Sequence, residues 1–160
     1  YLDKSTDLKK SDVVLYLGAA NGTTVSHVAD YAESVYAVEF APRPMQDLLA
    51  VSARRKNIIP IYGDATRPKE YAALLEPADI LYQDVAQPNQ ASIIIRHLPF
   101  LKKGGQVILM LKTRSVDIRK TPEEVFAESC AELEAAGLTV EKGVWLNPYH
   151  IDHAAIVCRK

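Results

Sequence analysis

Short apolar runs alternate with helix-like patterns along the whole chain. The apolar runs predict strands near residues 13–17, 35–39, 58–61, 79–84, 106–112, 139–145 and 154–158. Between them, patterns of helical spacing predict helices near residues 23–32, 42–55, 69–75, 89–101 and 121–136. Because strands that alternate with helices form parallel sheets with both faces covered, the pattern predicts an α/β fold with a mostly parallel, seven-stranded sheet and helices on both faces.

Local signals support these boundaries at the last predicted helix. Thr121-Pro122-Glu123-Glu124 has the spacing of a capping box, with proline at the first helical position, and Gly137 stands where the helix should end. Phe126, Cys130 and Leu133 repeat at helical spacing and are predicted to face the core. Lys103-Gly104-Gly105 is predicted to be a tight turn that precedes the strand at 106–112.

The last two predicted strands have no room for a helix between them. The connecting segment reads WLNPYHIDH, so these strands are expected to form an antiparallel pair at the end of the sheet. Five parallel strands followed by such a pair are typical of Rossmann-like methyltransferases, whereas a dinucleotide-dependent dehydrogenase would more often continue in parallel.

Composition narrows the class of protein. The chain has 160 residues, 48% of them hydrophobic, which suits one globular domain, and its net charge of −1 is not that of a general nucleic-acid binder. Cys130 and Cys158 show no metal-binding or redox spacing and are expected to be buried apolar residues. Without a signal peptide or a stretch of membrane-spanning length, we expect a cytoplasmic protein, nucleolar in a eukaryote, with no membrane partner.

The segment LGAANGTT, residues 17–24, carries the first functional signal. It lies between an apolar run and an amphipathic helix, where Gly18 permits a turn and Gly22 would let the backbone approach a ligand. A dinucleotide site would require G-x-G-x-x-G, but Ala20 takes the place of the middle glycine. The threonines that follow suit a carboxylate as well as a phosphate. The loop therefore fits S-adenosylmethionine, which has no phosphate, better than NAD.

Residues just after each predicted strand should meet at one edge of the sheet, because ligands bind beyond the carboxyl ends of parallel strands. These residues are Gly18, Glu39-Phe40, Asp64-Ala65, Asp84 and Lys112, with His150, Asp152 and His153 in the final turn. Glu39 is placed to accept hydrogen bonds from a ribose, and Phe40 to pack on an adenine. Simpler roles remain open: Glu39 or Asp64 could cap the following helix, and Lys112 could extend into solvent.

The chain resembles fibrillarin, the RNA 2′-O-methyltransferase of C/D-box guide ribonucleoproteins, over nearly its whole length. The strings that carry the resemblance are VLYLGAANGTTVSHVAD (14–30), VYAVEF (35–40), NIIPIYGDA (57–65), YQDVAQP (82–88), LKTRSVD (111–117) and PYHIDH (148–153).

The resemblance implies S-adenosylmethionine as the cofactor and assigns parts of it to different residues. Thr23 and Thr24 would meet the methionine part, Asp64 and Ala65 the adenine edge, and the segment after the fourth strand the sulfonium. The full predicted cofactor-binding set is Gly18, Ala19, Thr23, Thr24, Glu39, Phe40, Asp64, Ala65, Asp84, Val85, Ala86 and Gln87.

The family's catalytic set is lysine, aspartate, lysine and histidine, and the resemblance places its last three members at Asp84, Lys112 and His153. The first lysine comes from a helix with an R-S-K motif, which follows a small N-terminal domain in the family. Residues 1–160 are expected to form a single methyltransferase domain without either. In the predicted mechanism, Lys112 stabilises the alkoxide that develops on the ribose oxygen. Asp84 orients Lys112 and the hydroxyl, and His153 supports this group or passes the proton on.

The basic residues that follow the fifth strand, Arg114, Arg119 and Lys120, are predicted to contact RNA phosphates. The implied partners are a C/D-box guide RNA, its target rRNA or tRNA, the scaffold subunit of the particle and a kink-turn-binding ribosomal-type protein. Two alternatives remain at this stage: a small-molecule O-methyltransferase, or a non-catalytic subunit that binds cofactor or scaffold. A metal-dependent form of the first is disfavoured, because only Asp84 and Asn89 offer oxygen ligands after the fourth strand, and no metal is predicted.

Overall fold

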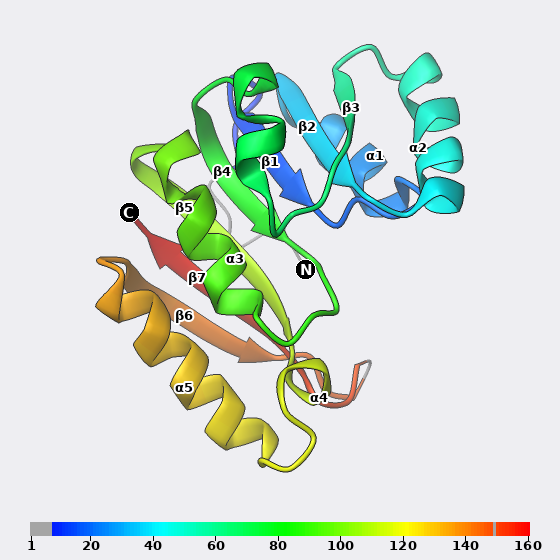
Figure 1. Ribbon diagram of the computed structural model, residues 1–160. Helices are drawn as coiled ribbons and strands as arrows, with labels where there is room; N and C mark the ends of the chain where they lie inside the picture. The colour runs from blue at the N-terminus through cyan, green and yellow to red at the C-terminus, as the bar shows by residue number, and fades with distance from the viewer. Residues whose placement is uncertain (1–7, 149) are drawn as a thin grey trace.

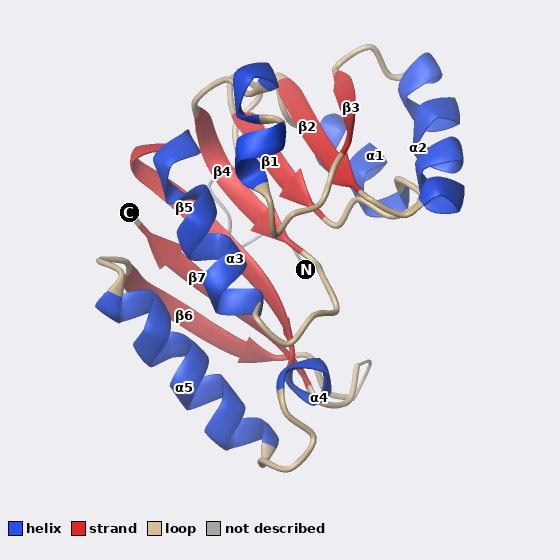
Figure 2. Cartoon of the chain, in the orientation of Figure 1, coloured by secondary structure: helices blue, strands red, loops and turns tan. Residues whose placement is uncertain are grey.

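A computed structural model of the chain describes residues 8–148 and 150–160 and contains one seven-stranded sheet with the order β3-β2-β1-β4-β5-β7-β6 (Figures 1 and 2). The strands are β1 Val13–Leu17, β2 Ser34–Glu39, β3 Ile58–Tyr62, β4 Ala78–Gln83, β5 Leu101–Lys112, β6 Thr139–Trp145 and β7 His153–Arg159. The α-helices are α1 Thr23–Ala29, α2 Pro42–Arg54, α3 Gln90–His97, α4 Thr113–Val116 and α5 Pro122–Ala135, and three 3-10 turns are η1 Pro68–Glu70, η2 Ala72–Leu74 and η3 Leu98–Phe100.

The sheet reverses its order between β1 and β4. From β1 the chain adds β2 and β3 on one side, then returns to place β4 and β5 on the other, and all four pairings are parallel. The crevice at such a switch point is where open α/β sheets bind ligands. The predicted α/β architecture is therefore confirmed, and its expected ligand edge lies at the ends of β1 and β4.

The last two strands confirm the predicted antiparallel pair, and their order in the sheet is the reverse of their order in the sequence. β7 lies between β5 and β6 and is antiparallel to both, so β6 forms the edge of the sheet (Figure 1). This insertion brings His153 opposite Lys112, the last residue of β5. The arrangement buries the apolar strand β7, whose residues Ala154, Ile156, Val157 and Cys158 are at most 3% exposed, and leaves the more polar β6 outside.

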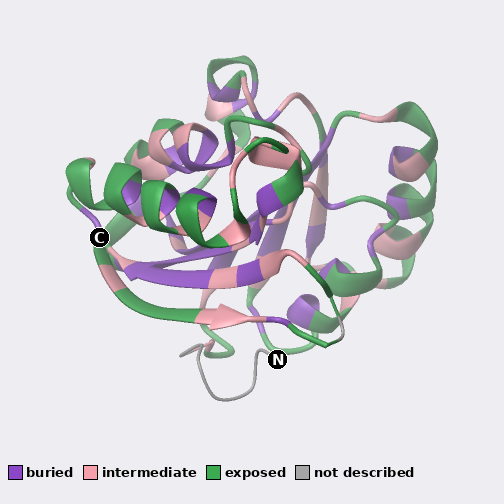
Figure 3. Cartoon of the chain, turned by 90° about the horizontal axis from the view of Figure 1, so that it is seen from below, coloured by how far each residue is buried: buried purple, intermediate pink, exposed green. Residues whose placement is uncertain are grey.

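Each face of the sheet carries its own apolar core. Helices α1 and α2 cover one face with Val25, Val28 and Leu48, and α3 and α5 cover the other with Ile93 and Leu133. Figure 3 shows the buried residues gathered on the strands and on the inward sides of the helices. None of the described helices is long and apolar enough to cross a membrane.

The predicted helix at 69–75 is wrong in type, because the segment forms the two short turns η1 and η2 instead. Tyr71 separates them with a φ of −126°, which is outside the helical range. The side chain of Tyr71 is buried, and its hydroxyl lies 2.8 Å from His97 Nε2. A seven-residue helix has little intrinsic stability, so this tertiary contact decides the local conformation.

The glycine pair before the fifth strand does not form the predicted preceding turn. β5 already begins at Leu101, and Gly104 and Gly105 lie inside it where the register against β4 jumps, from Ala78 opposite Leu101 to Ile80 opposite Gln106. Gly104 adopts a φ of +76°, which glycine tolerates best. The segment is thus an irregular bulge within the strand.

Helix α5 keeps its predicted ends but turns slightly from its predicted face. The Thr121–Glu124 capping box is present in both directions, and Gly137 has a φ of +90° after the helix. The fully buried line is Val125, Ser129 and Leu133, while Phe126 and Cys130 are only partly buried beside it. The reason is the neighbouring strand β6, against whose Trp145 the Phe126 ring packs at 5.5 Å.

Candidate active site at the carboxyl edge of the sheet

The carboxyl ends of β1, β2, β4 and β5 surround a cleft of about 260 Å³. It receives side chains and backbone from all four strand ends and from the segment after β4. Its lining is Gly18, Ala20, Val38, Glu39, Phe40, Gly63, Ala65, Asp84, Val85, Ala86, Gln87 and Lys112. Most of the predicted cofactor-binding residues are therefore brought together in one place.

The turn after β1 requires glycine at its first position. Gly18 has a φ of +82°, and a Cβ on it would lie 2.5 Å from the carbonyl oxygen of Asp84. Its N–H donates to the carbonyl of Val38 at 3.0 Å, which binds the turn to the end of β2. The bare backbone at Gly18 thus lets three strand ends approach one another at the floor of the cleft.

Gly22 packs against α2. A Cβ at this residue would meet Leu48 Cδ1 at 3.0 Å and Val51 Cγ2 at 3.4 Å, so the missing side chain makes room for α2. Gly22 is also the N-cap of α1, with a φ of +84°. It does not line the cleft, and approach of a ligand to its backbone stays a prediction.

Glu39 is a buried carboxylate held by backbone donors. It is 7% exposed, and it accepts hydrogen bonds from the N–H of Ala20 at 2.8 Å, Phe40 at 3.0 Å and Ala41 at 2.7 Å. A carboxylate has about four acceptor positions, so three backbone bonds leave it able to accept from a ligand hydroxyl. The neighbouring Phe40 ring is 59% exposed at the cleft, where it offers an apolar surface for stacking.

Asp84 and Lys112 form an ion pair at the opposite wall of the cleft. Lys112 Nζ lies 2.7 Å from Asp84 Oδ1, and the two side chains are 25% and 33% exposed. Asp84 follows β4 and Lys112 ends β5, so the parallel pairing of these strands brings them together. The sequence predicted this meeting, and the partial exposure leaves both groups accessible to a substrate.

Two tyrosines of β1 and β4 lie close to Asp84, and the sequence indicated no role for either of them. Tyr16 and Tyr82 stack with ring centroids 4.6 Å apart. Burial, together with the negative charge of Asp84, raises the pKa of both phenols, so they remain protonated at neutral pH.

His153 stands beside Lys112 but outside the lining of the cleft. The two residues are directly paired between β5 and β7, so their side chains leave the same face of the sheet. The Nδ1 atom of His153 lies 2.7 Å from the carbonyl oxygen of Ile151, so Nε2 is the ring nitrogen outside this contact. The predicted catalytic histidine is thus adjacent to the predicted lysine, on the rim.

The remaining predicted cofactor residues, Ala19, Thr23, Thr24 and Asp64, do not line the cleft. The hydroxyl of Thr23 donates a hydrogen bond to Asn21 Oδ1 at 3.0 Å, and Ala19 is buried. Asp64 Oδ1 accepts from the N–H and hydroxyl of Thr66, both at 2.8 Å, which closes a local turn and does not cap the following 3-10 turn η1, whose N-cap is Arg67. Its neighbours Gly63 and Ala65 do line the cleft, so Asp64 stands directly behind the wall.

The predicted RNA-binding residues each contact a carboxylate of the same chain. Arg114 Nε donates to Asp152 at 2.9 Å, Arg119 binds Asp117 through two nitrogens, and Lys120 Nζ lies 2.7 Å from Glu128. Arg119 lowers the pKa of Asp117 to about 2 by hydrogen bonding to it. Exposed pairs of this kind are weak and exchange readily for other anions, so these cations remain available to phosphates.

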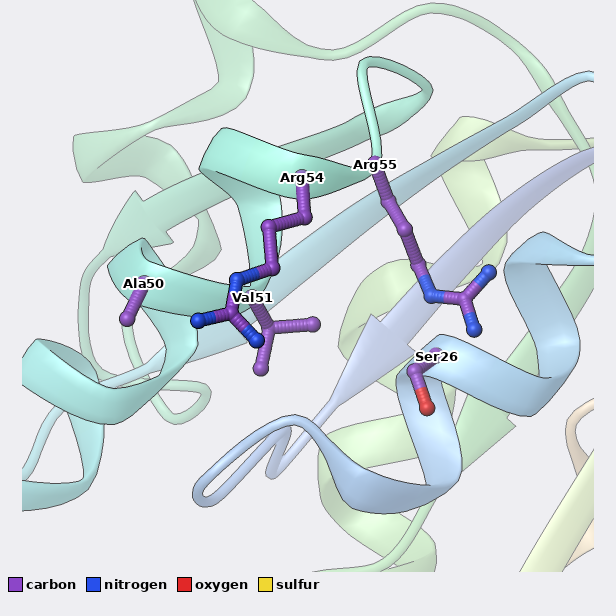
Figure 4. A pocket seen from close by; sticks show the side chains of 5 residues that line it. All are labelled: Ser26, Ala50, Val51, Arg54 and Arg55. Atoms are coloured by element: carbon purple, nitrogen blue, oxygen red, sulfur yellow. The ribbon is translucent and has the colours of Figure 1, made fainter.

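A groove between α1 and α2 shows none of these features. The groove has a volume of about 420 Å³ and is lined by Ser26, Ala50, Val51, Arg54 and Arg55 (Figure 4). Arg55 is paired with Asp30, and the hydroxyl of Ser26 donates to the backbone of Thr23. The described residues also contain no cluster of three or more side chains suited to a metal ion. The cleft at the strand ends, unlike this groove, brings together most of the predicted cofactor-binding residues and the Asp84–Lys112 ion pair.

Comparison with known proteins agrees with this site. A family model described as Fibrillarin matches residues 3–160. A fibrillarin-like rRNA/tRNA 2′-O-methyltransferase from Methanoculleus marisnigri is 65% identical over 147 residues, which cover 92% of this chain and 73% of that relative.

Two solved structures extend the comparison. Aeropyrum pernix fibrillarin in complex with natively bound S-adenosyl-L-methionine is 45% identical, with a TM-score of 0.85, and the match covers 94% of this chain and 67% of that one. A fibrillarin/Nop5p complex contains a chain that is 42% identical, with a TM-score of 0.88 and coverage of 94% and 73%. Sequence and fold therefore agree over nearly the whole chain.

Proposed function

This chain belongs to the fibrillarin family, and from that membership we propose that it transfers a methyl group from S-adenosylmethionine to the 2′-hydroxyl of an RNA ribose. The observation that carries the proposal is the Asp84–Lys112 ion pair, which stands in the same cleft as Glu39 and Phe40. One wall of the cleft thus offers groups for a nucleoside, and the other offers a cation and an acid for a hydroxyl.

The chemistry of the lining fits the cofactor. Glu39 has spare acceptor capacity for a ribose hydroxyl, and the exposed Phe40 ring can stack on an adenine. Asp84 and Gln87 supply polar groups on the other side of the cleft. S-adenosylmethionine, when bound, supplies an activated methyl group on a sulfonium. The Aeropyrum pernix relative, which is 45% identical and was solved with this ligand natively bound, supports the assignment.

The protein side chains then have to activate one ribose hydroxyl and accept its proton. A ribose hydroxyl is a weak nucleophile, and the Lys112 ammonium would stabilise the negative charge that develops on its oxygen. Asp84, 2.7 Å from Lys112, would hold the ammonium in place and accept a hydrogen bond from the hydroxyl. His153, paired with Lys112 between β5 and β7, would pass the released proton to solvent through Nε2.

The particle in which this reaction takes place is the second part of the proposal. One structural relative was solved in a complex with Nop5p, which supports a scaffold protein as a partner of this chain. We further propose a C/D-box guide RNA, a target rRNA or tRNA and a kink-turn-binding protein as the other components. Arg114, Arg119 and Lys120 would contact RNA phosphates near the cleft, because these cations are exposed and their ion pairs are weak.

Reconstitution tests the function directly. The chain is assembled with a C/D guide RNA, a scaffold subunit and a kink-turn-binding protein, and transfer of labelled methyl to a complementary RNA is measured. Label at the single ribose selected by the guide, and none on a target with a 2′-deoxyribose at that position, is the expected result. If calorimetry showed binding of S-adenosylmethionine but the assembled particle transferred no methyl group, the chain would be a non-catalytic cofactor-binding subunit. That result would overturn the proposal.

A further inference from the structure

β4 and β5, whose carboxyl ends carry Asp84 and Lys112, do not end at the same level of the sheet. The parallel register of β4 and β5 ends at Gln83 opposite Leu109, whereas β5 continues for three more residues to Lys112. Lys112 is paired with His153 of β7 on one side, but on the other side no strand of the described chain accompanies it. Unpaired backbone groups at such a position would let the end of a strand move.

The side chain of Gln90 takes the place of the missing strand. Its Nε2 donates to the carbonyl oxygen of Lys112 at 3.1 Å, and its Oε1 accepts from the N–H of Lys112 at 3.1 Å. Gln90 is the first residue of α3 and is only 1% exposed. A primary amide has the same donor and acceptor as a peptide group, so Gln90 satisfies both backbone groups of one residue.

A second buried glutamine connects this contact to Asp84. Gln83, directly before Asp84 in sequence, is 0% exposed, and its Nε2 donates to the carbonyl oxygen of Gln90 at 2.8 Å. The chain of bonds therefore runs from the residue next to Asp84, through Gln90, to the backbone of Lys112. The network holds the backbone of Lys112 and joins it to the residue that directly precedes Asp84.

We propose that Gln90 is a positioning residue, which holds the backbone of Lys112 so that its ammonium stays in register with Asp84. The inference rests on the proposed function, since it assigns a role toward the same reaction. A displacement of about 1 Å in a reacting constellation can lower a rate by about 100-fold. The buried bonds of Gln90 therefore act on the rate of methyl transfer more than on binding of the cofactor, because the groups proposed for its ribose and adenine, Glu39 and Phe40, lie on the opposite wall.

The chain offers a matched control on the same strand. Gln106 is also a buried glutamine, 3% exposed, and it lies near the amino end of β5, six residues before Lys112. Replacement of either glutamine by methionine removes the amide and keeps the approximate volume. Gln106→Met therefore reports the cost of losing a buried amide from this sheet without touching the site.

The test measures single-turnover methyl transfer in the reconstituted particle. Gln90→Met is expected to lower the rate by about 10- to 100-fold, with the dissociation constant of S-adenosylmethionine changed by less than about twofold. Gln106→Met is expected to keep the wild-type rate. Equal rates for Gln90→Met and wild type would overturn the inference, whereas an inactive wild-type particle would instead contradict the proposed function.

A double-mutant cycle separates positioning from a general loss of structure. If Gln90 acts through Lys112, Gln90→Met has no further effect in a Lys112→Ala background, because the group that it positions is gone. An equal loss in both backgrounds would show that Gln90 only supports the fold. Should Gln90→Met fail to melt cooperatively, Gln83→Met, which keeps both bonds to Lys112, is measured in the same cycle and is expected to give a smaller loss that also disappears with Lys112→Ala.

Discussion

The Lys112 ammonium lies 2.7 Å from Asp84 Oδ1, and the Lys112 side chain is only 25% exposed. The positive charge therefore acts in a partly desolvated environment. If Lys112 stabilises the alkoxide only in the transition state, its removal should slow the reaction without weakening the cofactor. We expect Lys112→Ala to lower single-turnover methyl transfer by about 100-fold or more, as loss of comparable donors does in other enzymes. The dissociation constant of S-adenosylmethionine should stay within about twofold of wild type.

His153→Ala is the matched comparison for this lysine variant. His153 pairs with Lys112 in the sheet but stands outside the lining of the cleft, where water can replace its imidazole. Its loss should therefore reduce the rate less than Lys112→Ala does. Unchanged activity of Lys112→Ala would remove this residue from the mechanism and leave it as a strand-end lysine.

Glu39 and Phe40 should separate stability from binding, although they are neighbours. Glu39→Ala leaves three backbone N–H groups without their acceptor, which should cost about 1–3 kcal/mol of unfolding free energy in addition to cofactor affinity. Phe40→Ala removes a ring that is 59% exposed, so it should weaken binding and leave the melting temperature almost unchanged. Calorimetry with S-adenosylmethionine and thermal melting check both. Wild-type affinity of Phe40→Ala would exclude the ring from the site.

At the scale of elements, the junction of β1, β2 and β4 depends on Gly18. Gly18 and Gly104 both have positive φ values, +82° and +76°, so alanine at either is expected to cost about 1–2 kcal/mol in backbone strain. At Gly18 the new Cβ would also meet a backbone atom, the carbonyl oxygen of Asp84, at 2.5 Å. At Gly104 no atom lies within 4 Å of the position of the new Cβ. Urea unfolding should show a clearly larger loss for Gly18→Ala, together with loss of cofactor binding. Equal losses would mean that the junction can open without cost.

At the scale of the whole molecule, stability should depend on pH through a buried histidine. Burial lowers the pKa of His97, which is held between Tyr71 and the carbonyl oxygen of Ile93. Below the pKa of about 6.5 in the unfolded chain, His97 binds a proton in the unfolded chain but stays neutral in the folded chain. The contribution of His97 to the free energy of unfolding is therefore fully present above that pH and is lost as the pH falls.

Substitution isolates this contribution. His97→Gln should flatten the acid limb of a plot of unfolding free energy against pH below about 6.5, whatever its own cost in stability. His27, which is exposed on α1, provides the control, and His27→Gln should keep the wild-type slope. An acid limb that His97→Gln leaves unchanged would assign the pH dependence to carboxylates instead.

The proposed RNA contacts involve the whole particle. If Arg119 neutralises a phosphate, Arg119→Ala should reduce the slope of log affinity against log salt by about one, and Arg114→Ala should weaken different guide targets to a similar extent. Lys56→Ala, an exposed lysine after the end of α2, should keep the wild-type slope. Filter binding over a range of salt concentrations measures both. A loss that varied strongly with target sequence would contradict a phosphate contact.

Features that depend on neighbours in sequence could be predicted for this protein. The turn at Gly18 and the capping box at Thr121 follow from backbone preferences that a few residues determine. The meeting of Asp84 with Lys112 was also predictable, because parallel strands place their carboxyl ends at the same edge of a sheet. Periodicity and a general rule of topology were sufficient there.

Tertiary structure alone decided the features that need a contact between distant segments. The order of β6 and β7, the partners of Gly22 and the pairing of Arg114 with Asp152 depend on which surfaces meet after folding. Gln90 gave no signal in sequence, since its role exists only because β5 extends beyond β4. The physical reason is that local preferences determine strand and helix positions, whereas burial and backbone hydrogen bonding between elements determine what each side chain contacts.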